Sequence, residues 1–189
     1  MTSASTRLVA LPCIDSPDIA MSRRSELDIG TSEAAALGRS AVAASRNGYY
    51  LNADGEKVDM RSLVQRACAA KLSIAPDHQL PAPQLRPESE TRVQVANETT
   101  LQASRRLFEA GLQPLALNFA NGVHPGGGFL NGARAQEEVL CRSSALYLTL
   151  VGDPMYECHA QRPQPDSTDW AIYSPHVPVF RTDDRVSRG

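Results

Sequence analysis

The spacing of apolar residues between positions 32 and 75 predicts a mainly helical region. Ser32 or Thr31 can cap an alanine-rich run that ends near Asn47-Gly48, and a second run with helical spacing follows residues 58–60. Between these runs, Asp54-Gly55 is typical of a hairpin turn. We therefore expect two helices joined by a short extended segment and a turn.

The segments on either side of this region have other patterns. Residues 1–31 combine a short apolar run with Ser, Thr and Arg, and we expect a disordered leader there rather than a targeting signal. Residues 76–91 hold four prolines among polar residues, which neither a helix nor a strand tolerates. This composition predicts a linker, with a second region from residue 92 to residue 189.

From residue 92 onward, strand and helix patterns alternate. The expected elements are a strand over 92–96, a helix from Thr99 or Thr100 to Gly111, a strand over 114–120, a helix over 135–151 and a strand that begins at 170–173. The run 114–120 is almost entirely apolar, as a buried parallel strand is. This order predicts an α/β fold with a mostly parallel sheet flanked by helices, and with residues 32–75 as an accessory layer.

Composition and charge exclude several classes of partner and site. The net charge is −2 without a basic segment, so direct binding to nucleic acid is not expected. No apolar run approaches the ~20 residues of a membrane span, so no membrane association is expected. The four cysteines form no CxxC pair, and Cys158-His159 and His176 lack metal-ligand spacing, so neither a metal nor a disulfide scaffold is predicted. A reducing compartment, the cytoplasm or the nucleus, is the expected location.

The candidate chemistry lies in the loop between the predicted strand 114–120 and the helix that follows. Gly126, Gly127 and Gly128 are consecutive, so the backbone can adopt positive φ and its N–H groups can approach a ligand. A loop at the carboxyl end of a strand that leads into a helix can hold a phosphate group. Neither a GxxxxGK[ST] nor a GxGxxG motif is present, and the alternative is a tight turn without a ligand.

Glu137 and Glu138 follow this loop at the expected start of the helix. Favourable electrostatics at a helix start would explain them without any function. Next to an anion site, however, a carboxylate beside a second carboxylate tends to hold a proton, which is the state that a general acid needs. One glutamate could then orient a sugar hydroxyl while the other protonates a leaving oxygen, as in glycoside cleavage.

The signature of three glycines, seven residues and Gln-Glu-Glu resembles that of the microbial-type poly(ADP-ribose) glycohydrolases, a branch of the macrodomain superfamily. The resemblance covers roughly residues 33–185. Further matching segments are Asn97-Glu98-Thr99-Thr100, Leu117-Asn118-Phe119-Ala120, Leu140-Cys141-Arg142, Ile172-Tyr173-Ser174-Pro175 and Val177-Pro178-Val179-Phe180-Arg181. The resemblance implies a macrodomain-like fold and a hydrolase that acts on poly(ADP-ribose) or ADP-ribose on modified proteins, without a cofactor.

The resemblance also implies residue roles. Glu138 matches the glutamate that protonates the departing ribose oxygen and then activates water, and Glu137 matches its partner that holds the ribose. Gly126, Gly127 and Gly128 match the loop against the pyrophosphate. Gln136 and Phe129 belong to the same signature and are expected to contact the ligand. For Asn121, a contact to the distal ribose and an Asx turn into Gly122 both remain open.

One departure from the family pattern concerns the end of the chain. The family closes the pyrophosphate from a second side with another glycine-rich loop, whereas residues 153–188 contain no glycine. We therefore expect the C-terminal part of the fold to be missing. Two functions follow: hydrolysis of ribose–ribose O-glycosidic bonds that releases ADP-ribose, or, alternatively, a non-catalytic or weak ADP-ribose-binding module that lacks the second phosphate loop.

Overall fold

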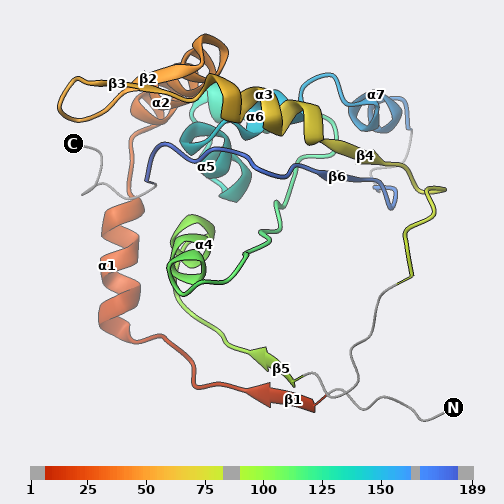
Figure 1. Cartoon of the computed structure of the whole chain (residues 1–189). Helices are drawn as coiled ribbons and strands as arrows, with labels where there is room; N and C mark the ends of the chain where they lie inside the picture. Colours follow the sequence, from red (N-terminus) through yellow and green to blue (C-terminus); the bar gives the residue numbers. More distant parts are fainter. Residues whose placement is uncertain (1–6, 83–89, 163–166, 183–189) are drawn as a thin grey trace, which may run out of the picture.

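The structure, a computed structural model, describes residues 7–82, 90–162 and 167–182. Figure 1 shows the chain as two halves. What we call the packed half contains α2 (Thr31–Asn47), β2 (Tyr49–Leu51), β3 (Lys57–Asp59), α3 (Arg61–Ala70), β4 (Leu72–Ile74), the 3-10 helix η1 (Phe129–Asn131), α5 (Gln136–Ser143), α6 (Leu146–Leu150), α7 (Pro154–Ala160) and β6 (Ala171–Tyr173). The open half contains β1 (Arg7–Ala10), α1 (Pro17–Leu27), β5 (Glu90–Val93), α4 (Thr100–Glu109) and residues 112–120.

The strands of the described residues form three two-stranded sheets. β1 pairs in parallel with β5, whereas β2–β3 and β4–β6 are antiparallel. The last pair joins residues 72–74 to residues 171–173, and so connects the predicted helical region to the end of the described chain. The α/β class predicted from the sequence is confirmed, and the parallel pairing among the described strands is that of β1 with β5.

The predicted elements around residue 50 are present. The Asn52 side-chain oxygen accepts hydrogen bonds from the N–H groups of Asp54 and Glu56, and Gly55 has a φ of +79°, so a hairpin joins β2 to β3. Gly48, with a φ of +76°, ends α2 as a left-handed cap. Thr99, one of the two expected starts of the helix, caps α4 and forms a capping box with Gln102.

The expectation that residues 1–31 form a disordered leader is wrong for the described residues 7–31, which contain β1 and α1. Ser16 caps α1 by accepting a hydrogen bond from the Ile19 N–H, and Pro17 occupies the first helical position. β1 gains its hydrogen bonds from β5, about eighty residues later, a partner that a local pattern does not reveal. Residues 1–6, and residues 83–89 of the expected linker, lie outside the described residues.

The buried core lies between α2, η1 and α5. Phe129 of η1 is 1% exposed, and its ring packs against Tyr147 at 4.9 Å between ring centroids. A Cβ at Gly38 of α2 would lie 2.8 Å from the Phe129 carbonyl oxygen, so only glycine allows this close approach. The helical region thus packs directly on the elements that carry the glycine loop and the glutamates.

The strand predicted over 114–120 is not formed. These residues have no regular secondary structure, and Leu115 and Phe119 are 82% and 74% exposed. A run of apolar residues becomes a buried strand only when another strand pairs with it, and no described strand does. Phe108 of α4 is also exposed, because no described element packs against it.

The helix predicted over 135–151 is divided into α5 and α6. The break is at Ser144, whose hydroxyl donates to the Leu140 carbonyl and accepts from the Leu146 N–H. Residues 178–181 form backbone hydrogen bonds with the chain at this break. The Ala145 N–H donates to the Pro178 carbonyl, and the Phe180 N–H donates to the Ser143 carbonyl. A distant segment therefore replaces the hydrogen bonds that would continue the helix.

Candidate active site

The glycine loop forms tight turns directly above the start of α5. Gly126 and Gly127 have φ values of +73° and +56°, which L side chains rarely adopt. The Gly127 N–H donates to the His124 carbonyl at 2.9 Å. The turns direct the N–H group of Gly126 toward Glu137 and that of Gly128 toward Glu138.

Glu137 is almost completely enclosed, with 3% of its surface exposed. Its Oε2 accepts from the Asn121 N–H at 2.8 Å, and its Oε1 accepts from the Gly126 N–H at 3.2 Å and from Asn118 Nδ2 at 3.4 Å. Burial raises the pKa of Glu137 above its ordinary value, and the nearby Glu138 carboxylate adds to this effect, while the three hydrogen bonds oppose it.

Glu138 is held more loosely. Its Oε1 accepts one hydrogen bond, from the Gly128 N–H at 3.0 Å, and its Oε2 has no hydrogen-bond partner among the described residues. A Cβ at Gly127 would collide with Oε1 of Glu138 and lie 3.2 Å from Oε2 of Glu137. The loop therefore passes over both carboxylates, and glycine at position 127 is required by their proximity.

The structure brings six of the eight sequence-predicted site residues together at this loop, by way of their backbone or carboxylate groups; these are Glu137, Glu138, Gly126, Gly127, Gly128 and Asn121. The side chain of Asn121 forms the Asx turn, because its Oδ1 accepts from the N–H groups of Val123 and His124. Only its backbone N–H reaches Glu137.

Phe129 and Gln136 have structural positions. Phe129 is a core residue beneath the loop, and its expected contact with a ligand stays a prediction. The Gln136 side chain donates to the Leu117 carbonyl and to Thr100 Oγ1, and accepts from the Phe119 N–H. It thereby fixes the chain that enters the loop, and it borders a cavity of about 290 Å³ that Glu98, Thr100 and Arg134 also line.

Two further polar groups near Glu137 were not singled out from the sequence. The Oδ1 of Asn118 and the hydroxyl of Tyr156 are buried without a hydrogen-bond partner in the described chain. Burial raises the pKa of the Tyr156 hydroxyl, and the Glu137 charge adds to that effect. Asn118 could have been proposed from its place at the end of the apolar run, whereas nothing in the sequence connects Tyr156 to the loop.

The described residues form neither a metal-binding cluster nor a membrane-spanning helix. Within residues 7–82, 90–162 and 167–182, no three His, Cys, Asp or Glu side chains are grouped closely enough to hold a metal ion. In the same ranges, no helix has both the length and the apolar character needed to cross a membrane.

Comparisons with known proteins point to one family. The family model for the microbial-type PARG catalytic domain matches residues 38–182. The solved structure of poly(ADP-ribose) glycohydrolase from Thermomonospora curvata is similar, with a TM-score of 0.72 and 38% identity over 80% of this chain. The structure of the same enzyme bound to the inhibitor ADP-HPD has a TM-score of 0.71 and 39% identity over 80% of this chain. The structure of the enzyme from Deinococcus radiodurans in complex with ADP-ribose has a TM-score of 0.52 and 36% identity over 67% of this chain.

The chain spans only part of these relatives. It covers 58% and 56% of the two Thermomonospora chains and 53% of the Deinococcus chain. A search of curated proteins found no match.

Proposed function

Because this chain belongs to the microbial-type poly(ADP-ribose) glycohydrolase catalytic domain family, we propose that it hydrolyses ribose–ribose O-glycosidic bonds of poly(ADP-ribose) and releases ADP-ribose. The observation that carries the proposal is that two adjacent carboxylates under one glycine loop accept different numbers of hydrogen bonds. Both oxygens of Glu137 accept hydrogen bonds, whereas Glu138 keeps Oε2 without a partner among the described residues.

This inequality supports different roles for the two glutamates. Glu138 can offer Oε2 to the bond that breaks, protonate the departing ribose oxygen and then take a proton from the water that adds to the anomeric carbon. Glu137, fixed by three donors, can hold the ribose that is cleaved. Water supplies the hydroxyl group on one product, and the proton given by Glu138 completes the hydroxyl group on the other.

The ligand would then lie against residues 126–128, where the N–H groups of Gly126 and Gly128 already point at the two carboxylates. The inhibitor ADP-HPD and ADP-ribose in the similar structures support a ligand of this class. We also propose ADP-ribosylated proteins as the physiological partners, in the cytoplasm or nucleus.

The decisive experiment measures both cleavage and binding. Glu138→Gln should lower the release of ADP-ribose from polymer by ~10²–10⁴-fold, because glutamine cannot transfer a proton, and should retain most of the ADP-ribose affinity in calorimetry. The matched control is Glu157→Gln, a change at an exposed glutamate in the first turn of α7. Parent-like cleavage by the Glu138 variant would refute the proposed mechanism.

The alternative function is an ADP-ribose-binding module without catalysis, and the ADP-ribose complex of the similar Deinococcus enzyme supports a ligand of this class. It predicts calorimetric binding without polymer cleavage in the parent chain. It also predicts that Glu137→Gln weakens binding more than Glu138→Gln does, since Glu137 is the glutamate proposed to hold the ribose.

A further inference from the structure

His159 in the last turn of α7 is buried and contacts the loop that precedes the glycines. Its Nδ1 lies 2.9 Å from the Gly122 carbonyl oxygen, and its Nε2 lies 2.7 Å from Thr168 Oγ1. A Cβ at Gly122 would lie 3.2 Å from Nδ1, so the ring packs directly on this part of the loop. Neither the cleavage mechanism nor the family signature described above uses this histidine.

The surrounding hydrogen bonds select one tautomer of the ring. The Thr168 N–H points at Nε2 from 3.4 Å, so Nε2 carries a lone pair there. The Thr168 hydroxyl can also donate to Nε2 while it accepts from the Trp170 N–H at 3.3 Å. Nδ1 therefore carries the hydrogen and donates to the Gly122 carbonyl, which is a strong acceptor in a partly buried place.

The contact reaches the candidate active site through one peptide. Gly122 follows Asn121, whose N–H donates to Glu137 Oε2 at 2.8 Å. The Asn121 side chain closes the Asx turn over residues 121–124, so the Gly122 carbonyl and the Asn121 N–H belong to the same rigid turn. Fixing the carbonyl on one side of this turn fixes the donor to Glu137 on the other.

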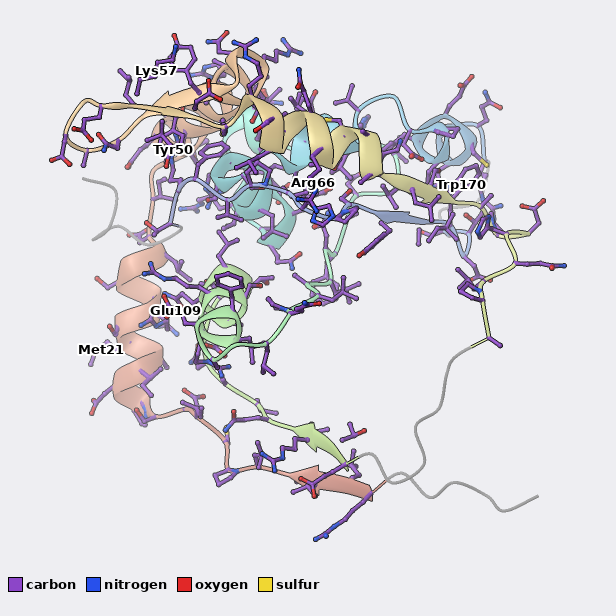
Figure 2. All side chains as sticks on the ribbon, viewed as in Figure 1. Met21, Tyr50, Lys57, Arg66, Glu109 and Trp170 are labelled. Atoms are coloured by element: carbon purple, nitrogen blue, oxygen red, sulfur yellow. The ribbon has the colours of Figure 1, made fainter. Side chains whose placement is uncertain are left out.

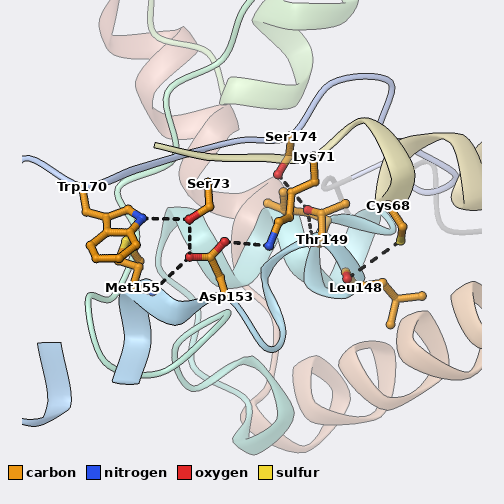
Figure 3. A network of polar contacts seen from close by, with 10 residues as sticks. Cys68, Lys71, Ser73, Leu148, Thr149, Asp153, Met155, Trp170 and Ser174 are labelled. Atoms are coloured by element: carbon orange, nitrogen blue, oxygen red, sulfur yellow. Dashed lines mark hydrogen bonds and ion pairs between the residues drawn. The ribbon is translucent and has the colours of Figure 1, made fainter. Parts of the chain in front are cut away.

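The helix that carries His159 is itself anchored at its other end. Asp153 caps α7 and is buried, and Figure 3 shows its carboxylate between Lys71, Ser73 and the Met155 N–H. The distances are 2.6 Å to Lys71 Nζ, 2.9 Å to Ser73 Oγ and 3.1 Å to the Met155 N–H. Trp170 Nε1 also donates to Ser73 Oγ at 2.9 Å. α7 is therefore held in place, and His159 extends from a fixed support.

We propose that His159 is a positioning residue for Glu137, which it controls by donating from Nδ1 to the Gly122 carbonyl and thereby fixing the Asn121 N–H. This inference rests on the proposed function for its catalytic consequence. The geometric part, the coupling of His159 to the Asn121 amide, stands on the contacts alone, so the two parts can be tested separately.

The test uses the full chain labelled with ¹⁵N and measures hydrogen exchange of the Asn121 amide. In His159→Asn, the side-chain amide nitrogen replaces Nδ1 and can still donate to Gly122, whereas in His159→Gln it lies nearer the position of Nε2. We expect ~10-fold faster exchange of the Asn121 amide in His159→Gln, and a change below about threefold in His159→Asn. His78→Gln, at an exposed histidine far from the loop in sequence, is the matched control and should not change the exchange.

Polymer cleavage by the same proteins gives the catalytic readout. His159→Gln should lower kcat/KM by ~10²-fold, as small misplacements in an active site do, and His159→Asn should restore most of it. If the parent chain does not cleave polymer but the Asn121 amide exchanges faster in His159→Gln than in the parent, the inference is upheld and the proposed function is refuted. Equal Asn121 exchange in the glutamine, asparagine and parent proteins would overturn the inference.

A second variant keeps the test decisive if His159→Gln does not fold. Gly122→Ala places a methyl group against the ring and should speed Asn121 exchange in the parent. In the His159→Asn background the shorter side chain leaves room, so the same change should have a smaller effect. An identical effect of Gly122→Ala in the two backgrounds would show that the loop does not depend on His159.

Discussion

The packed half and the open half differ in how far they bury aromatic side chains. Phe129 is 1% exposed between α2 and α5, whereas Phe119, ten positions earlier, is 74% exposed. Figure 2 shows Tyr50 and Trp170 among the crowded elements of the packed half, and Met21 and Glu109 on the isolated helices of the open half. Phe129 and Phe119 are the same residue type, so the presence of a packing partner decides their burial.

This difference explains why the candidate active site is well formed. Glu137 and Glu138 are the first carboxylates of α5, which packs on η1 and α2. The support for the carboxylates thus comes from the packed half, and Gln136 and Asn118 connect them to the open half. Substitutions in the two halves should therefore differ strongly in their effects.

The largest expected difference is between two phenylalanines. Phe129→Ala should lower the free energy of unfolding by about 3–5 kcal/mol, because it leaves a cavity in the core. Phe119→Ala should change it by no more than about 0.5 kcal/mol, since the ring is exposed. Urea unfolding of both variants measures this, and equal losses would show that the open half is packed in solution.

Two ion pairs provide the next comparison. Asp153→Ala should cost about 3 kcal/mol, at the lower end of the range for breaking a buried pair, because the Lys71 side chain remains 22% exposed. Glu109→Gln, which breaks the exposed pair with Arg105 on α4, should cost about 0.5 kcal/mol or less. If the two losses were alike, the Asp153 network would not support α7.

Glycine substitutions separate backbone strain from contact. Gly111→Ala, at a φ of +80° with open space around it, should cost only the strain of a left-handed residue, about 1–2 kcal/mol. Gly127→Ala should cost about 1 kcal/mol more, because the new methyl group displaces Glu138 from the Gly128 N–H. It should also weaken ADP-ribose binding in calorimetry, and unchanged affinity would move the ligand away from this loop.

The smallest expected effect concerns pH. Burial raises the pKa of Glu137, so the folded state favours its protonated form; this contribution to stability is present below the ordinary pKa and is lost as pH rises through the raised value. The stability of the parent relative to Glu137→Gln should therefore fall between acidic and neutral pH. Urea unfolding across this interval measures the difference, and a rise instead would mean that the three donors outweigh burial.

Local signals were sufficient for part of the fold. The left-handed cap at Gly48, the hairpin around Gly55 and the capping box at Thr99 each depend on residues a few positions apart, and each is present. The strand predicted over 114–120 failed because its apolar pattern says nothing about a partner. The division of the predicted helix at Ser144 comes from residues 178–181, which no local pattern connects to it.

The candidate active site shows the same limit. The glycines and the glutamates are close in sequence, and the structure brings them together as the motif predicts. Phe129 belongs to the same motif, yet it serves the core, since a motif does not distinguish residues that contact a ligand from those that support the loop. His159 was missed because it reaches Gly122 across 37 positions.

The antiparallel pair β4–β6 has a consequence for the time at which the packed half can form during synthesis. Ser73 and Trp170, which are bonded across this pair, are 97 positions apart. At a ribosomal rate of ~5–20 residues per second, β4 waits ~5–20 s for its partner. For much of that interval α2 has left the ribosome before η1 and α5, the elements that pack against it, so we expect the nascent chain to depend on chaperones until they emerge.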